Sequence, residues 1–295
     1  MPASPSSSAQ TARQRLGEQL RAMRQAARIT GREFARRAGW ASASPVTMIE
    51  RGQRTISPDH INLWCDICGV PERRRAELLA EQDNVAGMWR TWKQINRAGL
   101  SATQRAGHGR YEKVRHFRSY TSNGIGGLVQ SEGYMRVALE AVRLDQGLEV
   151  DDVSEAVAER IRRKAVFQRV GARWVFLIEG QALQHRLYPV DVHREQLEYL
   201  LEMTTDPGRW PSVSLGIIPL EADRTRDGVH GIWPEESFTI FDDRVNIELI
   251  SGYLSISRPD EVAMYVAAWE RLMGLAVHGE QAAGQIRAAL AVLDR

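Results

Sequence analysis

The stretch Ile29-Thr30-Gly31-Arg32-Glu33-Phe34-Ala35-Arg36-Arg37-Ala38-Gly39, then a Ser-rich turn and Pro45-Val46-Thr47-Met48-Ile49-Glu50-Arg51-Gly52-Gln53-Arg54, decides the fold of the N-terminal part of this chain. Thr30 is suited to cap a short helix whose Phe34, Ala35 and Ala38 face inward. Gly39 suits the positive φ of a tight turn, and Val46 and Ile49 anchor a second helix. The sequence therefore predicts a helix-turn-helix with the outer face of its second helix free.

Several fixed spacings occur together around this stretch. They are Leu16-Gly17-x-x-Leu20-Arg21-x-x-Arg24, Phe34-Ala35-x-x-Ala38-Gly39, Ile49-Glu50-Arg51-Gly52 and Cys68-Gly69-Val70. In this combination the chain resembles the xenobiotic-response-element family of Cro-like helix-turn-helix regulators. The resemblance implies that the helix after the turn enters the major groove of double-stranded DNA, whereas the helix before it crosses the phosphate backbone.

The resemblance also implies which side chains contact DNA. The base-facing positions correspond to Ser42, Ala43, Ser44, Thr47 and Met48, and the phosphate contacts to Arg24, Arg32, Arg51 and Arg54. Bases are usually read by bidentate Arg, Asn or Gln, whereas this face offers hydroxyls, a methyl group and a thioether. Specificity is therefore expected to draw on DNA shape, on Arg51 or on the rest of the protein.

Charge is distributed unevenly along the 295 residues. Residues 1–75 contain 13 Arg and 6 acidic residues, a net charge of +7, while the remaining 26 basic and 31 acidic residues leave a net charge of −5. A positive field over the helix-turn-helix is what binding to phosphates requires. The distribution favours nucleic acid as the partner of the N-terminal part.

Two features argue against a membrane protein, a secreted protein and a metal-binding protein. No run of about 18 apolar residues and no charged, apolar leader is present, so we expect neither a membrane span nor a secretory signal, and a cytoplasmic protein. Cys65 and Cys68 form a C-x-x-C, with His60 as the only nearby third ligand. Because a helix at this spacing points both thiols toward the core, buried small residues are favoured over a metal site, and no metal or cofactor is assigned.

The domain organisation follows from composition and periodicity. We expect a mobile tail over 1–14, a helix-turn-helix domain of five helices over 15–82, a connecting helix over 83–110 and a C-terminal domain over 111–295. Trp89 and Trp92 lie on the apolar stripe of the connecting helix, where aromatic residues are more often core than ligand-stacking groups.

The C-terminal domain is expected to contain both helices and strands. Helices are predicted at 111–119, 151–170, 193–203, 259–276 and 281–293, and strands at 174–178, 213–218, 237–241 and 245–250, the last two joined by a hairpin turn at Asp242-Asp243. The helix at 151–170 is rich in Arg and Lys and is interpreted as a solvated face or as a site for an acidic partner. The predicted fold class is α+β, an all-α domain followed by a small sheet flanked by helices.

This second half also shows a resemblance. Its motifs are Ile125-Gly126-Gly127-Leu128-Val129-Gln130-Ser131-x-x-Tyr134, the Arg-Arg-Lys helix, the strand end at Pro219 and Ser237-Phe238-Thr239-Ile240. They resemble an uncharacterised domain found behind such helix-turn-helix modules in actinobacteria. The chemistry of that domain does not follow from the resemblance.

Known catalytic spacings are absent from the sequence, including H-E-x-x-H, G-x-S-x-G and the P-loop. The densest polar cluster is the loop from Glu221 to Trp233. The loop is interpreted either as a solvent-exposed connection or as an effector site between Asp223, Asp227, His230 and Trp233 and the Gly126-Gly127 turn. The solvent-exposed connection is the more common case for such a loop.

Two functions remain open at this point. One is a dimeric transcription regulator whose C-terminal domain senses a small molecule or a small partner protein. The other is an enzyme or ligand-binding protein that keeps a degenerate helix-turn-helix for assembly. The regulator is favoured. It is expected to act as a homodimer, because one recognition helix buries too little surface for a specific site.

Overall fold

The computed structural model describes the backbone of residues 5–226 and 230–294, and side chains within 10–82, 85, 87–88, 90–225 and 231–294. The chain divides into two compact units, residues 1–90 and 91–295. Each unit has its own hydrophobic core. None of the helices in the described residues is long and apolar enough to cross a membrane.

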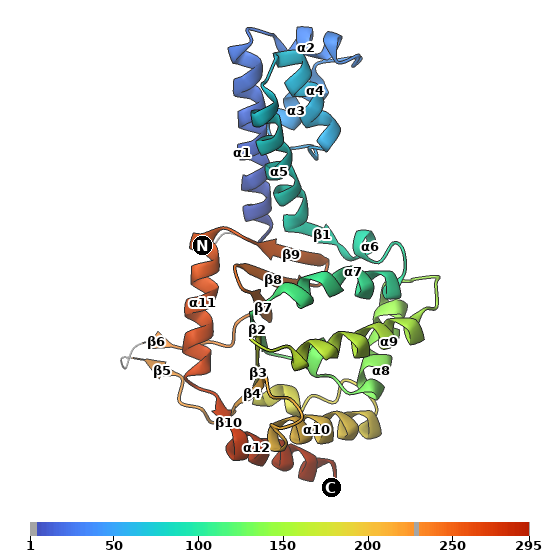
Figure 1. Cartoon of the computed structure of the whole chain (residues 1–295), viewed down its shortest axis with the longest axis vertical. Coiled ribbons are helices and arrows are strands. Elements are labelled where there is room, and N and C mark those ends of the chain that lie inside the picture. The colour runs from blue at the N-terminus through green and yellow to red at the C-terminus, as the bar shows by residue number, and fades with distance from the viewer. Residues whose placement is uncertain (1–4, 227–229, 295) are drawn as a thin grey trace. The chain divides into compact units, whose positions relative to one another are not determined.

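Unit 1 consists, over residues 5–88, of the helices α1 (Pro5–Ala26), α2 (Gly31–Arg37), α3 (Ser44–Glu50), α4 (Pro58–Cys68) and α5 (Glu72–Met88) (Figure 1). Its core centres on Phe34 and Trp64, whose ring centroids are 4.2 Å apart. Leu16 and Leu20 of α1 and Ile49 of α3 are fully buried around them. Burial of these large apolar side chains stabilises the unit.

Two glycines are required by this packing. Gly39 ends the turn after α2 with φ +71°, a conformation that costs an L side chain energy. Gly17 lies where a Cβ would be 2.6 Å from the backbone oxygens of both Ile49 and Glu50, so only glycine lets α1 approach the end of α3 this closely. The two positions fix α3 against the rest of the unit.

The first helix begins earlier than expected. The sequence predicted a mobile tail over 1–14, whereas α1 is helical from Pro5. The side chain of Gln10 donates a hydrogen bond of 3.2 Å to the backbone oxygen of Gly52, in the turn after α3. This tertiary contact, which no local pattern encodes, holds the first turns of α1 against the unit.

The single connecting helix predicted over 83–110 is wrong. The chain instead forms the end of α5, the strand β1 (Trp89–Thr91), the short helix α6 (Trp92–Ile95) and α7 (Leu100–Lys113). The helix is interrupted because Thr91 caps α6 in a capping box with Gln94, and because the carboxylate of Asp152 accepts hydrogen bonds from the amides of Leu100 and Ser101 at the start of α7.

Among the described residues, eight strands form one mixed sheet in the order β1-β9-β8-β7-β2-β3-β4-β10. The central strands β2 (His116–Thr121), β3 (Arg173–Glu179) and β4 (Val213–Ile218) are parallel. The strands β7 (Phe238–Phe241), β8 (Arg244–Leu249) and β9 (Gly252–Ile256) continue from β2 as an antiparallel meander, and β10 (Val277–His278) pairs with β4. The predicted strands and the hairpin turn at Asp242-Asp243 are present.

The helix predicted over 111–119 is partly wrong. Helix α7 ends at Lys113, and residues from His116 onward form the central strand β2. The carboxylate of Asp242 accepts hydrogen bonds from the amides of Arg115 and His116 and so holds the start of the strand. Pairing with β3 and β7 on its two sides overrides the local helical pattern.

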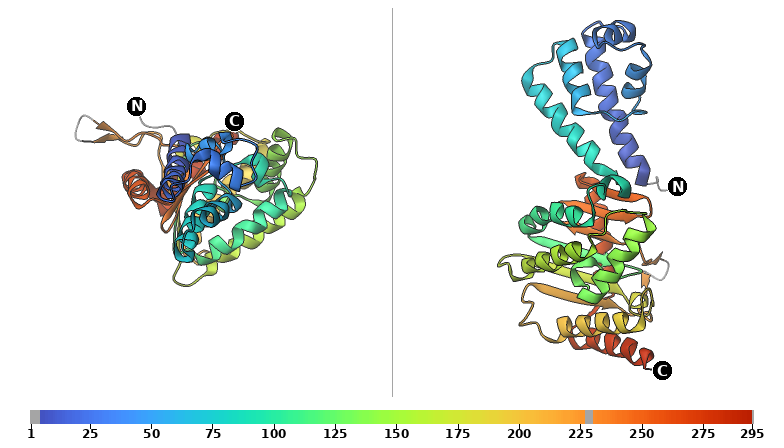
Figure 2. Two further views of the ribbon diagram at one scale, coloured as in Figure 1. Left: turned by 90° about the horizontal axis from the view of Figure 1, so that it is seen from above. Right: turned by 90° about the vertical axis from the view of Figure 1, so that its right-hand side faces the viewer.

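Helices cover both faces of the sheet (Figures 1 and 2). One face is covered by α7, η1 (Gly127–Val129), α8 (Glu132–Asp145), α9 (Val153–Arg163), η2 (Lys164–Gln168), η3 (Gly180–Leu183), α10 (Val190–Thr205) and α12 (Gly279–Leu293). The opposite face carries α11 (Pro259–Met273), whose Tyr265 ring lies 5.1 Å from that of Phe238. A two-stranded ribbon, β5 (Thr225–Arg226) and β6 (His230–Gly231), projects from this unit.

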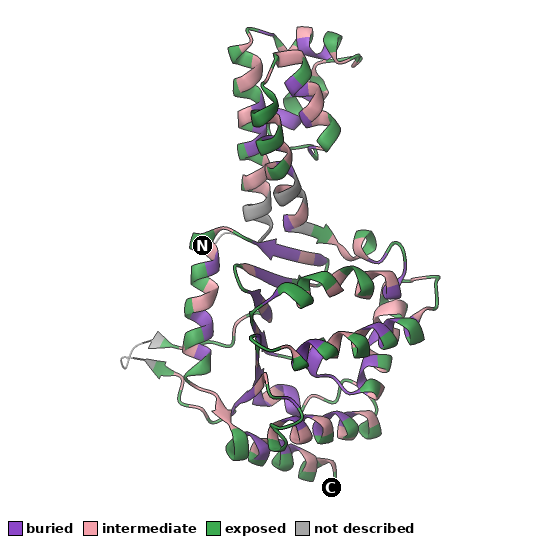
Figure 3. Ribbon diagram, in the orientation of Figure 1, coloured by how far each residue is buried: buried purple, intermediate pink, exposed green. Residues whose placement is uncertain are grey.

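Burial follows these layers, with most of the sheet strands buried and the helices buried on one side only (Figure 3). The aromatic part of the core joins Phe117 and Phe241, whose centroids are 5.0 Å apart, to Trp174. The chain is therefore α+β, with a helical N-terminal domain and a mixed sheet flanked by helices, as the sequence predicted.

Candidate nucleic-acid interface and ligand-binding region

Helices α2 and α3 form the helix-turn-helix. The Oγ1 of Thr30 accepts a hydrogen bond from the amide of Glu33 and so caps α2. Helix α3 turns Val46 and Ile49 into the core and leaves Thr47 and Met48 exposed, Met48 with an exposed fraction of 40%. The alternation of inward and outward positions along α3 leaves one face of the helix exposed, on which the Oγ1 of Thr47 donates only to the backbone oxygen of Ala43.

The residues before α3 continue this face. Ser42 and Ser44 are exposed, and Ala43 is the half-buried N-cap of α3, without a side-chain hydrogen bond. Pro45 lies in the first turn, where a missing amide hydrogen costs nothing. The predicted base-facing residues thus lie together at the N-terminal end and outer side of α3.

Arg24 differs from the other predicted phosphate contacts. Its Nε and Nη2 donate to the two carboxylate oxygens of Glu50 at 2.6 and 2.8 Å, and its Nη1 donates to the backbone oxygen of Ile29 at 2.8 Å. Both side chains are nearly buried, with exposed fractions of 12% and 6%. The hydrogen bond to Glu50 raises the pKa of Arg24. Arg24 therefore ties α1 to the end of α3.

The other predicted phosphate contacts are free of such partners. Arg32, Arg51 and Arg54 are exposed, and no ion pair or hydrogen bond joins their guanidinium groups to a side chain in the described residues. By contrast, Arg36 and Arg37 both bind the carboxylate of Glu33 and lower its pKa to about 2. Exposed cations without a protein partner are the groups best placed to neutralise phosphates.

The C-x-x-C pair packs into the core of unit 1. Cys65 is buried and Cys68 is half-buried against the same core, and burial raises the pKa of both thiols. The ring of His60 lies in a capping box with Ser57 at the start of α4. The thiols accordingly have the surroundings of small core residues.

The loop predicted to bind an effector has a partly structural role. Asp223 is exposed, and its Oδ1 accepts hydrogen bonds from the amide and hydroxyl of Thr225, which forms a local turn. Trp233 is 74% exposed. Asp227 and the side chain of His230 lie outside the described residues. The described members of the cluster are therefore not brought together around a common centre.

A buried ionic network anchors this loop. The carboxylate of Glu179, at the end of β3, accepts hydrogen bonds from Tyr120 at 2.9 Å and from Arg224 at 2.5 Å. Burial and this hydrogen bond raise the pKa of Tyr120, so its hydroxyl stays protonated. Sequence reasoning missed all three residues because they come from distant segments.

The basic helix is not a solvated face. Arg160, Arg163 and Lys164 point inward from α9 and η2 and donate hydrogen bonds to Gln104 or Gln130. Arg169 donates to the backbone oxygens of Tyr111 and Val114. Only Arg162 of the cluster is exposed, beside Glu159. The interpretation as an open acidic-partner site is therefore wrong for most of these residues.

The tryptophans expected on a connecting helix lie elsewhere. Trp92 is part of α6, and its Nε1 donates a hydrogen bond of 2.8 Å to the backbone oxygen of Leu249. The side chain of Trp89 lies outside the described residues. Trp92 thus fastens α6 to the end of β8.

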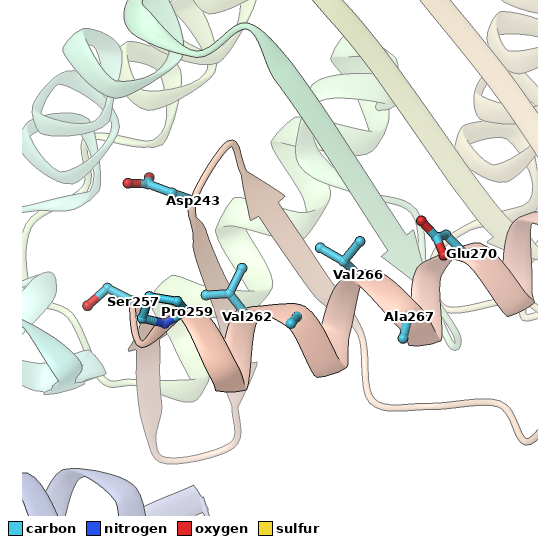
Figure 4. A pocket seen from close by; sticks show the side chains of 8 residues that line it. Asp243, Ser257, Pro259, Val262, Val266, Ala267 and Glu270 are labelled. Atoms are coloured by element: carbon cyan, nitrogen blue, oxygen red, sulfur yellow. The ribbon is translucent and has the colours of Figure 1, made fainter.

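An open groove of about 460 Å³ runs along α11 (Figure 4). Val262 and Val266 form its apolar wall, and Asp243 and Ser257 border it. Glu270 is the only charged side chain that α11 contributes to its lining. Such a surface suits apolar contact more than the recognition of a polar ligand.

Two family models match the chain. The model described as a helix-turn-helix domain matches residues 15–78, which include α2 and α3. Domains of this class bind DNA, so the match supports DNA binding and a part in transcription regulation. No curated protein and no solved structure matches the chain. The model described as a domain of unknown function (DUF5753) matches residues 112–288, and since this is more than half of the chain, the protein belongs to the DUF5753 family.

Proposed function

We propose that this protein is a Cro-like, DNA-binding transcription regulator whose C-terminal domain binds a small-molecule effector. The observation that carries the proposal is the exposed face of α3, with Thr47 and Met48 on it and the unpartnered Arg51 directly after it. An exposed polar helix face with free cations at its edge is the arrangement that enters a DNA groove.

Each predicted contact receives a role in this proposal. Ser42, Ala43, Ser44, Thr47 and Met48 contact base edges. Arg32, Arg51 and Arg54 neutralise phosphates, whereas Arg24 positions α3 through Glu50 and does not contact DNA. Hydroxyls and a thioether discriminate bases weakly, so most of the affinity comes from phosphates and is sensitive to salt.

A binding titration tests the proposal. Fluorescence anisotropy of the full chain with labelled duplexes, drawn from a promoter pool that includes the protein's own upstream region, is expected to show saturable binding at low salt. Complete absence of duplex binding under these conditions would contradict the proposal. Binding to single-stranded DNA alone would contradict it equally, since an α3 in the major groove needs a duplex.

The functional unit in this proposal is a homodimer, because two recognition helices must reach half-sites about one DNA turn apart. We assign the pairing surface to α11, which carries the groove of Figure 4 and the exposed Met264. Light scattering is expected to give twice the chain mass, and Val266→Glu in the groove is expected to give the monomer. A wild-type monomer, with and without DNA, would contradict the assignment.

The sequence-based location of the effector site remains a prediction. It predicts that Asp227→Ala together with His230→Ala abolishes the response to effector and leaves DNA binding intact. The turn made by Asp223 and the exposure of Trp233 give that loop no described polar centre.

A further inference from the structure

Five basic residues lie at one end of the sheet in unit 2. The strands β8, β7, β2 and β3 are neighbours, and their register brings the starts of β8, β2 and β3 and the end of β7 to the same edge. Arg244 begins β8, Arg115 directly precedes β2, and Arg173 begins β3. Arg110 and Lys113, in the last turn of α7, line an open groove of about 310 Å³ together with Arg244. We call these five residues the basic edge.

The basic edge forms no ion pair with an acidic residue in the part of the chain that the structure describes. Other exposed arginines of unit 2 do form such pairs, as Arg136 does with Glu132. Lys113, Arg115 and Arg173 are exposed, and within the same described part their side chains have no hydrogen-bond partner either. These cations are therefore available to bind an anion from outside the chain.

Three acidic residues belong to the same segments. The carboxylate of Asp242 accepts hydrogen bonds of 2.8 to 3.2 Å from the amides at the start of β2 and is directed toward them. Asp243 is exposed in the turn between β7 and β8 (Figure 4). Glu112 does not line the groove, because it projects from another side of α7 than the two basic residues of the last turn. Five cations and three carboxylates leave these segments with a net positive charge.

Arg110 is held in place by contacts within unit 2. Its guanidinium lies over the ring of Phe241, 5.3 Å from the ring centroid, and its Nη1 donates a hydrogen bond of 2.7 Å to the hydroxyl of Tyr253. Phe241 belongs to the core of unit 2, so the contact fixes Arg110 to the sheet. Its Nε and Nη2 have no hydrogen-bond partner among the described residues. A cation that is already ordered loses little entropy when it binds an anion.

The end of α7 does not itself require Arg110 and Lys113. Basic residues in a last helical turn usually interact with the free carbonyl groups there. At α7 this is already done by Arg169, which donates to the backbone oxygens of Tyr111 and Val114 at 3.1 and 2.9 Å. Arg169 also offsets the partial negative charge of the helix end, which would otherwise repel an anion.

We propose that the basic edge binds the phosphate backbone of duplex DNA, in addition to the contacts that α3 makes. Arg244 and Arg173 begin strands that are three places apart in the sheet, a separation of about 14 Å. One small anion cannot contact both, whereas a DNA strand presents a phosphate about every 3.4 Å along the helix axis. This inference rests on the proposed function, since it adds a second contact with the same partner.

An acidic protein segment would carry the same sign of charge as DNA. Duplex DNA is favoured because the exposed face of α3 offers hydroxyls and a thioether, so its base contacts are weak and the affinity must come from phosphates. Both surfaces belong to one chain, so a duplex bound by unit 1 is at a high effective concentration for the basic edge.

The salt dependence of duplex binding by the full chain tests the basic edge. Lys113→Ala with Arg115→Ala is expected to reduce the slope of log Kd against log salt concentration by about 0.9 for each lost phosphate contact. Arg136→Ala with Arg287→Ala removes the same charge from ion-paired arginines elsewhere in unit 2 and is expected to leave the slope unchanged. An unchanged slope in the first variant, or an equal reduction in both, would overturn the proposal.

Circular dichroism checks that the variants fold. If Lys113→Ala with Arg115→Ala does not fold, Arg173→Gln, at the start of a different strand, is expected to reduce the slope by about 0.9 in its place. Labelled poly-L-glutamate is the probe for an acidic protein partner. Binding of this probe that the variant loses, together with an unchanged duplex slope, would overturn the proposal in favour of such a partner.

The proposed function and the basic edge fail separately. If Arg51→Ala with Arg54→Ala reduces the slope and the variants of the basic edge do not, the basic edge is wrong and the regulator stands. If only the variants of the basic edge reduce the slope, the basic edge stands and the assignment of α3 as the DNA-contacting helix is wrong. If the wild type binds no duplex, both are wrong.

Discussion

Two groups of basic residues look alike in the sequence and differ in the structure. Arg32, Arg51 and Arg54 of unit 1 are exposed and without side-chain partners in the described residues, whereas Arg160 and Lys164 of unit 2 point inward. Arg32 is exposed on α2, and Arg51 and Arg54 lie in the turn after α3, whereas Arg160 continues the buried stripe of α9. The density of charge in a segment therefore says little about its partner until the position of each basic residue relative to the core is known.

Within unit 1, Arg24 is nearly buried and paired, whereas Arg32, Arg51 and Arg54 are exposed. The largest expected effect on stability follows from this contrast. Glu50→Ala leaves the guanidinium of Arg24 nearly buried and unpaired, which is expected to destabilise unit 1 by about 3–5 kcal/mol. Hydrogen exchange of the full chain, read at the amides of α3, measures the loss of protection.

Glu33→Ala is the matched control, because it also removes an ion-paired carboxylate. The Arg36 and Arg37 partners of Glu33 are exposed to solvent, so little change in protection is expected. Equal loss of protection in both variants would show that the buried ion pair contributes no more to stability than the exposed one.

The inward group of unit 2 gives a pH-dependent prediction. Burial lowers the pKa of Lys164 from 10.5 to about 8, so the folded state binds its proton less tightly than the unfolded state. The contribution of Lys164 to stability is then expected to rise with pH between about 8 and 10, by about 1–3 kcal/mol because hydrogen bonds to Gln130 and Tyr199 oppose the shift. It is read as the difference between the wild type and Lys164→Met, because Cys65 and Cys68, whose thiol pKa is raised, contribute in the opposite direction. Urea denaturation across this range measures it.

Lys164→Met is expected to remove this rise, since methionine fills the site without a charge. Above about pH 10 the buried tyrosines begin to lose protons in the unfolded state and also change the stability. The wild type and Lys164→Met are therefore compared only below this pH. A rise of the same size in the variant would assign the effect to another group.

The smallest expected effect concerns base recognition. Thr47→Ala or Met48→Ala is expected to change the preferred duplex sequence by about fivefold or less, because each removes one weak base contact. Selection of bound duplexes from a random pool measures the preference. Gln25→Ala, an exposed residue of α1, serves as the control and is expected to keep the wild-type preference.

The sequence predicted those elements whose causes are local. Thr30 as a cap, Gly39 with positive φ and the inward Val46 and Ile49 are each settled by residues within one or two turns. The strands β3, β4, β7 and β8 could be predicted for the same reason, since each is a short run of apolar residues between turns.

The missed elements depend on distant partners. The strand β2 pairs with β3 and β7, and α7 begins where Asp152 caps it, some fifty residues away in the chain. The ion pair of Arg24 joins α1 to α3 in the same way. None of these contacts leaves a local pattern.

The inward direction of Arg160 and Lys164 had a signal that could have been used. Val153, Ala156 and Val157 form the buried stripe of α9, and Arg160 and Lys164 continue it at the next helical spacings. Charged residues that continue an apolar stripe are directed inward and need partners there. By contrast, Asn246 lies between apolar residues on β8 as on any half-exposed strand, so its burial could not be predicted from β8 itself.

The most direct test of the account compares the two basic groups in one measurement, the slope of log Kd against log salt concentration for duplex binding by the full chain. The account predicts that Arg51→Ala with Arg54→Ala reduces the slope by about 0.9 for each lost phosphate contact, whereas Arg163→Ala, at an inward residue, leaves it unchanged. An unchanged slope in the unit 1 variant, or an equal reduction in the unit 2 variant, would contradict it.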